Sequence, residues 1–311
     1  MSHRRPENVS AGEEASRATG TAEWAPTTLN VAMGCSHGCL YCYGRANALR
    51  RGQVADAEEW LAERVNEKRV AKGYAGGRGT IMLPSTHDIT PATVEAVGAV
   101  AVKLLEAKTP PGREPTRLLL VTKGDGPCIE RLARRLHEHA PSVGCWRDRV
   151  LWRITIGCLD ERTRQFWEPH APPIDMRLEA LRWLHGCGWQ TSVSCEPLLE
   201  PWNARQLVAA VAGYVVETIW IGKARELDHR TAWCRTRMGD ALTKAIENVE
   251  WWQDRESVVG IAQRLRCRLP IETWTKIRFK DSYAEELRKA DWRIEAGRVR
   301  SDPTETGGQQ P

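Results

Sequence analysis

Short apolar runs alternate with helix-like segments along most of this 311-residue chain, and this alternation restricts the fold more than any other feature. One of the runs, Arg117–Thr122, shows no polar alternation, as expected of a strand buried on both faces. The six predicted strands are Thr28–Met33, Gly79–Pro84, Arg117–Thr122, Val150–Ile156, Trp189–Cys195 and Glu217–Gly222. Repeated β–α units predict a parallel sheet with helices on its outer face, either a doubly wound open sheet or a partial barrel.

Segments with helical periodicity separate these runs. The predicted helices are Asp56–Lys72, a segment that starts near Pro91, Pro127–His139, Ile174–Gly186 and Ala204–Ala212. From Asp228 onward the pattern is helical and charged, with one β-like stretch at Trp274–Phe279. We therefore expect a disordered tail over 1–22, a β–α core over 23–224, a mainly helical extension over 225–301 and a second disordered tail over 302–311.

Charge and hydropathy restrict the partners and the cellular location that we expect for this chain. The net charge of +5 and the isoelectric point near 8.7 permit a polyanionic partner without requiring one. No apolar stretch approaches the roughly 18 residues of a membrane span. Residues 1–20 lack the apolar segment of a secretion signal. We therefore expect a cytoplasmic protein with no membrane partner.

Chemically capable side chains gather where the predicted strands end. Because parallel strands share one carboxyl edge, these side chains should face a common site. They belong to Cys35, Ser85, Thr86, His87, Asp88, Lys123, Asp125, Thr155, Ser194, Glu196 and Lys223. The same edge carries the densest group of cysteines in the chain.

Three of the ten cysteines, Cys35, Cys39 and Cys42, fall within eight positions. A structural zinc ion needs four ligands, and His37 is the nearest candidate for the fourth, although so compact a loop rarely wraps one ion. Three unrelated thiols would not be expected this close together. A cubane iron–sulfur cluster has four iron corners, so three thiolates leave one iron open for a small molecule. The spacing favours this last interpretation.

Four stretches resemble one family. The cysteine loop GCSHGCLYCY over 34–43 resembles that of the radical S-adenosylmethionine (SAM) superfamily, and specifically of its spore photoproduct lyase-like branch. TKGD over 122–125, EPHAPPIDMRLEAL over 168–181 and SCEPLLEP over 194–201 are similar to other stretches of that branch, in the same order. The resemblance implies a partial (β/α)6 barrel over 23–224 with the 225–301 extension covering its mouth.

The resemblance also implies an activity. Cys35, Cys39 and Cys42 would hold a [4Fe-4S] cluster that cleaves SAM reductively to a 5′-deoxyadenosyl radical, with a flavodoxin or ferredoxin as the one-electron reductant. The residues implied to lie near SAM are Ser85, Lys123, Thr155, Ser194 and Glu196. The substrate is not identified, and a nucleic acid base is the leading candidate. The alternative is a non-catalytic module that binds zinc or an iron–sulfur cluster.

One departure from the branch concerns hydrogen transfer. The lyase has a hydrogen-donating cysteine after its second strand, but no cysteine occurs here from Gly44 to Gly126, and Ser85 takes that place. A hydroxyl O–H bond is much harder to break homolytically than a thiol S–H bond. The resemblance leaves Tyr41 and Tyr43 as candidates for a hydrogen relay, with aromatic packing around the cluster as the alternative. Cys195 is a candidate for a substitute donor, with a buried structural thiol as the alternative.

Overall fold

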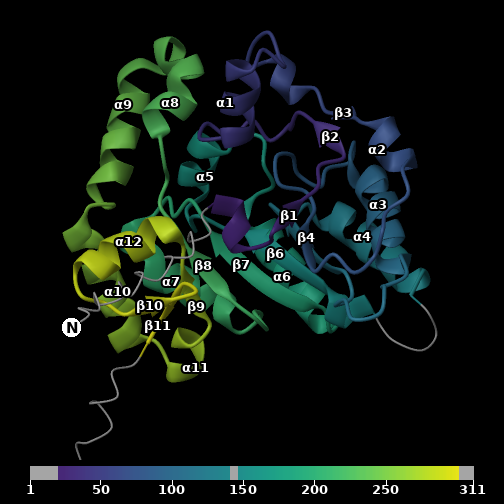
Figure 1. Cartoon of the computed structure of the whole chain (residues 1–311). Helices are drawn as coiled ribbons and strands as arrows, with labels where there is room; N and C mark the ends of the chain where they lie inside the picture. Colours follow the sequence, from purple (N-terminus) through teal and green to yellow (C-terminus); the bar gives the residue numbers. More distant parts are fainter. Residues whose placement is uncertain (1–19, 141–145, 301–311) are drawn as a thin grey trace, which may run out of the picture.

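The computed structural model describes residues 20–140 and 146–300, and within them a seven-stranded parallel sheet forms the centre of the molecule (Figure 1). Its strands, in spatial order, are β1 (Thr27–Thr28), β4 (Thr80–Met82), β5 (Arg117–Thr122), β6 (Val150–Thr155), β7 (Gln190–Cys195), β8 (Ile219–Ile221) and β9 (Ile277–Phe279). The edge strands β1 and β9 each pair with one neighbour and not with each other, so the sheet stays open. This arrangement confirms the predicted partial barrel.

Helices on the connections cover one face of the sheet. They are α3 (Val94–Glu106), α4 (Gly126–Glu138), α5 (Glu161–Trp167), α6 (Ile174–Gly186) and α7 (Ala204–Ala212). The side chain of Asp125 caps α4 by accepting the Cys128 N–H at 3.0 Å, and Asp160 caps α5 in the same way. Both caps lie in the short loops that follow β5 and β6, where the chain turns away from the sheet.

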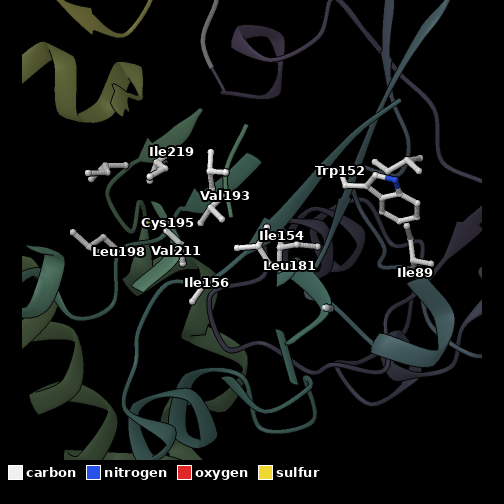
Figure 2. Packing of buried hydrophobic residues seen from close by; sticks show 14 of the residues in the cluster. Ile89, Trp152, Ile154, Ile156, Leu181, Val193, Cys195, Leu198, Val211 and Ile219 are labelled. Carbon is white, nitrogen blue, oxygen red and sulfur yellow. The ribbon is translucent and has the colours of Figure 1, made fainter. Parts of the chain in front are cut away.

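The main core lies between these helices and the outer face of the sheet. Trp152 and Ile154 of β6 and Val193 of β7 are fully buried there, together with Leu181 of α6 (Figure 2). Alternate residues of the same strands point to the opposite, inner face. The apolar side chains of this core fix the positions of the strand ends that carry the polar groups.

An N-terminal segment fills part of the inner face. The 3-10 helix η1 (Gly20–Glu23) leads into Trp24 and Ala25, which pack with Met82 and Leu119 in a small apolar cluster. Residues 20–22 therefore form part of η1, whereas the rest of the predicted tail over 1–22 and the whole of the tail over 302–311 lie outside the described residues. The segment packs against side chains of β4 and β5.

The predicted extension over 225–301 is mainly helical. Its helices are α8 (Leu227–Thr231), α9 (Arg235–Trp251), α10 (Arg255–Arg268), α11 (Ile271–Trp274) and α12 (Asp281–Lys289). The 3-10 helix η5 (Ala232–Cys234) lies between α8 and α9, and the strand pair β10 (Ile294–Glu295) and β11 (Arg298–Val299) follows α12. β9 also comes from this region and pairs with β8 in parallel, so the extension contributes the seventh strand. In Figure 1, α8 lies beside α1 (Tyr43–Arg50), the helix that follows the cysteine loop.

The prediction of one strand over Thr28–Met33 was wrong. The run divides into β1 and β2 (Ala32–Met33), and β2 pairs with β3 (Arg64–Val65) outside the main sheet. Side chains hold the chain between them, because Asn30 accepts the N–H groups of Ser85 and Thr86 at 2.8 Å each. These polar contacts draw the backbone off the sheet after two residues.

The predicted helix Asp56–Lys72 was also wrong. The structure has the 3-10 helix η2 (Glu59–Leu61), β3 and the short helix α2 (Glu67–Ala71) in its place. Asp56 accepts the N–H of Glu59, and Glu59 accepts that of Ala55, so local side-chain bonds replace a continuous helical ladder. In residues 20–140 and 146–300, no helix is both long and apolar enough to cross a membrane.

Candidate functional site

A cavity of about 490 Å³ opens at the carboxyl ends of the parallel strands. Its wall brings together the three predicted cluster ligands, Cys35, Cys39 and Cys42. Other predicted site residues that line it are Tyr41, Tyr43, Ser85, Lys123, Thr155, Ser194 and Glu196. The N-terminal segment and the extension complete the wall with Trp24 and Lys280. Residues far apart in sequence therefore meet at one site, as the strand-end pattern predicted.

The cysteine loop is held tightly by its backbone. Gly34 has a φ of +95°, and a Cβ added there would collide with the carbonyl oxygens of Trp60 and Ala62. The Cys35 N–H donates to the Trp60 carbonyl at 2.8 Å, and the Leu40 N–H donates to the Trp167 carbonyl at 2.8 Å. The loop is thus tied to the chain on both sides, which orients its thiols toward the cavity.

The chemistry of the three thiols fits an iron–sulfur cluster. All three are free, and Cys42 caps α1 by accepting the Arg45 N–H at 3.4 Å. Burial raises the pKa of Cys35, and it raises the pKa of Cys39 to about 12, so an iron centre must displace thiol protons when it binds. Among the described residues, no group of three His, Cys, Asp or Glu side chains is arranged to hold a single metal ion. In a cubane cluster each thiolate binds an iron of its own.

Asp88 anchors the loop from the strand side. Its carboxylate accepts the Thr122 hydroxyl at 2.6 Å and the Lys123 N–H at 3.1 Å, and it lies 3.3 Å from Nδ1 of His37. Burial alone would raise the pKa of Asp88, but His37, Lys123 and Thr122 hold it well below its usual range. Asp88 therefore stays ionised and links the end of β5 to the cysteine loop. It does not cap a helix, since α3 begins only at Val94.

Glu168 is a site residue that the sequence interpretation did not assign. It is 1% exposed, accepts the Tyr41 hydroxyl, and forms an ion pair with Arg177 at 2.5 Å. Lys123 Nζ lies 4.0 Å from the same carboxylate. Burial opposes ionisation of Glu168, but Arg177 and Lys123 lower its pKa overall. Glu168 is the first residue of the EPHAPPIDMRLEAL stretch, and this acidic residue was the sequence signal that could have identified it. The stretch lies far from the cysteines in sequence, so the contact of Glu168 with Tyr41 could not be predicted.

The opposite wall carries polar groups suited to a small ligand. Ser194 is fully buried, and its Oγ has no hydrogen-bond partner among the described residues. Thr155 lies on the neighbouring strand, in register with Ser194. Burial raises the pKa of Glu196, although Lys280 Nζ at 3.6 Å opposes this shift. An orphaned hydroxyl beside a carboxylate provides polar contacts that a bound molecule can use.

Tyr43 and Ser85 both line the cavity and contact each other. The Tyr43 hydroxyl donates to the Ser85 carbonyl, and Ser85 Oγ accepts from the Asn30 side chain at 2.9 Å. Burial raises the pKa of Tyr43 to about 12. Both side chains therefore stay neutral near pH 7.

The structure does not bring Cys195 to the cavity. It is the last residue of β7 and points to the outer face, where it packs among Val193, Leu198 and Val211 (Figure 2). Ser194 points inward because successive strand residues face opposite sides. Burial raises the pKa of the Cys195 thiol. Cys195 does not line the cavity, and it could donate hydrogen to a ligand there only by leaving the apolar core.

Comparisons with known proteins give distant similarities. No family model matches the chain. It is 29% identical over 214 residues to the uncharacterized protein ORF301 of Acidianus two-tailed virus, a match that covers 64% of this chain and 62% of that protein. The chain thus spans less than two thirds of the length of its curated relative.

Two kinds of solved structure are similar in fold. One is a C140A mutant of spore photoproduct lyase with dinucleoside spore photoproduct, at 17% identity and a TM-score of 0.45, over 68% of this chain and 60% of the other. Another is SuiB of Streptococcus suis bound to S-adenosylmethionine, at 10% identity and a TM-score of 0.40, over 64% and 40% of the two chains.

Proposed function

We propose that this chain is a radical SAM enzyme that binds a [4Fe-4S] cluster through Cys35, Cys39 and Cys42. One observation supports this function above others: three free thiols line the same cavity as a buried hydroxyl, Ser194 Oγ, that lacks a partner. The thiols suit a soft metal centre, and the unpaired hydroxyl suits a polar ligand beside it. With SAM, the bound cluster supplies a 5′-deoxyadenosyl radical that abstracts hydrogen from a substrate.

The residues around the cavity have separate tasks in this proposal. Ser194, Thr155 and Glu196 offer polar contacts to SAM from β6 and β7, and Lys123 and Ser85 offer them from the strand ends nearer the cysteine loop. Tyr41 and Tyr43 remain candidates for moving a hydrogen atom. The acceptors Glu168 and the Ser85 carbonyl hold their hydroxyls in fixed directions. The indoles of Trp24 and Trp60 line the same wall and exclude water from the site.

A nucleic acid base is the substrate that we propose. Support comes from the cysteine-loop resemblance and the net charge of +5. The cavity itself does not add to this support, because its cations are paired: Lys223, Arg225 and Arg230 each lie 3.1 Å from a carboxylate, of Glu286, Asp281 and Glu226 respectively. A flavodoxin or ferredoxin would deliver the electron. Deuterium carried from labelled DNA or RNA into 5′-deoxyadenosine or SAM would support this substrate, and deuterium carried only from a labelled peptide would contradict it.

The function itself is tested without knowledge of the substrate. The chain is reconstituted anaerobically with iron and sulfide, given SAM and dithionite, and assayed for 5′-deoxyadenosine by mass spectrometry. We expect several turnovers from the wild-type chain and background levels from Cys39→Ala. A brown, iron-loaded protein that forms no 5′-deoxyadenosine would contradict the radical assignment. One zinc per chain and no colour would favour the binding-module alternative.

A further inference from the structure

Arg45 is a buried cation directly beneath the cysteine loop. It lies in the first turn of α1 and is 1% exposed. Its guanidinium donates to the carbonyl of Cys39 at 2.5 Å and reaches that of Leu40 at 3.5 Å, and its Nε has no hydrogen-bond partner among the described residues. Its backbone N–H donates to Cys42 Sγ. Arg45 therefore touches the loop at two of the three cysteines.

The charge of Arg45 has no acidic partner. Two other buried arginines have one, since Arg177 pairs with Glu168 and Arg164 pairs with Glu161, each at 2.5 Å. Arg45 forms no ion pair within 20–140 and 146–300. A buried charge without a counter-charge is costly, and removal from water is not offset by two carbonyl contacts. Burial lowers the pKa of Arg45, whereas thiolates at Cys42 and Cys39 would raise it.

An indole from the extension holds the guanidinium against the loop. Trp233 belongs to η5, and the Cζ of Arg45 lies 3.7 Å from its ring centroid. Arg237 lies over the same ring at 5.1 Å. The face of the indole attracts a cation and fixes the plane of the guanidinium. The extension thus supports a residue of the cysteine loop that is far from it in sequence.

We propose that Arg45 is a positioning residue that places a permanent positive charge against the thiolates of the cluster, with Trp233 holding it there. This role rests on the proposed function. Three thiolates bring the negative charge that the guanidinium lacks among its present neighbours. Reduction of the cluster adds one more negative charge, so a fixed cation favours the reduced form. Arg45 thereby raises the cluster's reduction potential.

The test is an EPR-monitored redox titration of the iron-loaded chain. In Arg45→Gln we expect the equilibrium constant for one-electron reduction to fall about tenfold, which is about 59 mV toward more negative potential. Arg153→Gln is the matched control. Arg153 is also buried, also forms no ion pair among the described residues, and lies over the Trp24 ring at 4.6 Å, away from the cysteine loop. Its loss should leave the potential unchanged.

Arg45→Lys separates charge from packing. The ammonium keeps the positive charge but cannot lie flat on the indole, so we expect a potential close to that of the wild type. A tenfold loss in Arg45→Lys would overturn the inference, and this variant decides the matter if Arg45→Gln does not fold. An unchanged reduction potential in Arg45→Gln, or an equal shift of the potential in Arg153→Gln, would overturn the inference about Arg45. Neither result would affect the proposed function. A wild-type chain that takes up no iron would contradict the proposed function as well.

Discussion

The two faces of the parallel sheet use the same strands for different purposes. On β6, Trp152 and Ile154 point outward into an apolar core, and Arg153 and Thr155 point inward to charged and polar surroundings. The outer face contacts helices through close packing, and the inner face contacts side chains drawn from both ends of the chain. A single step along a strand therefore separates a residue needed for folding from one available to a ligand.

This difference explains how a cavity that contains charged and polar side chains is held open. The outer face pins each strand by apolar burial, which needs no particular partner. The inner face depends on polar contacts, such as that of Lys280 with Glu23 at 2.9 Å, and on hydroxyls such as Ser194. Substitutions on the two faces should therefore differ in kind, affecting stability on one side and binding or pH dependence on the other.

The largest effect should come from the outer face. Trp152→Ala removes a fully buried indole and should lower the free energy of unfolding by about 3–5 kcal/mol, because a cavity remains in the core. Urea unfolding followed by circular dichroism measures it. A loss below about 1 kcal/mol would mean that the helices do not pack on this face as described.

A smaller effect should come from Glu23, on the segment that fills the inner face. Burial and a side-chain bond to Asp281 raise its pKa to about 7 from 4.5, although Lys280 opposes the shift. Between these pH values the folded chain holds a proton that the unfolded chain has released, so stability should fall as pH rises from about 4.5 to 7. Melting temperatures across this range measure the slope.

Glu23→Gln should flatten that slope, because glutamine does not titrate. Glu256→Gln, an exposed position on α10, is the matched control and should leave the slope as in the wild type. An identical pH profile for Glu23→Gln and the wild type would contradict the role of Glu23.

The smallest effect should come from Ser194→Ala. The stability should change by less than about 0.5 kcal/mol, since the hydroxyl has no partner to lose. SAM binding should weaken by about 1 kcal/mol, roughly fivefold, measured by calorimetry on the iron-loaded chain. Ser192→Ala is the control, because its hydroxyl already donates to the Thr218 carbonyl and does not line the cavity. Equal losses in both variants would remove Ser194 from the binding site.

The sheet was predictable from sequence wherever a strand is buried on its outer face. The predicted runs at Arg117–Thr122 and Trp189–Cys195 agree with β5 and β7 to within one residue. The apolar run at Arg117–Thr122 indicates burial directly, and the predicted helix over Ala204–Ala212 agrees with α7. The strand ends consequently placed most candidate site residues on one edge.

The remaining elements depend on contacts that periodicity does not reveal. The division of Thr28–Met33 requires the Asn30 side chain to bind the turn at Ser85, and the inner-face position of Trp24 requires Arg153 and Lys280 beside its ring. Glu168 could not be assigned because its partner Arg177 lies inside a helix whose pattern looks ordinary. Charge pairing between distant segments leaves no regular spacing in the sequence.

Iron and sulfide analysis with Mössbauer spectroscopy of the anaerobically reconstituted chain tests the central claim most directly. We expect about four irons per chain in a [4Fe-4S] cluster. One iron site should change its signal on addition of SAM, and a variant with alanine at Cys35, Cys39 and Cys42 should hold no cluster. A wild-type chain that binds a single metal ion, or a triple variant that still assembles the cluster, would contradict this account.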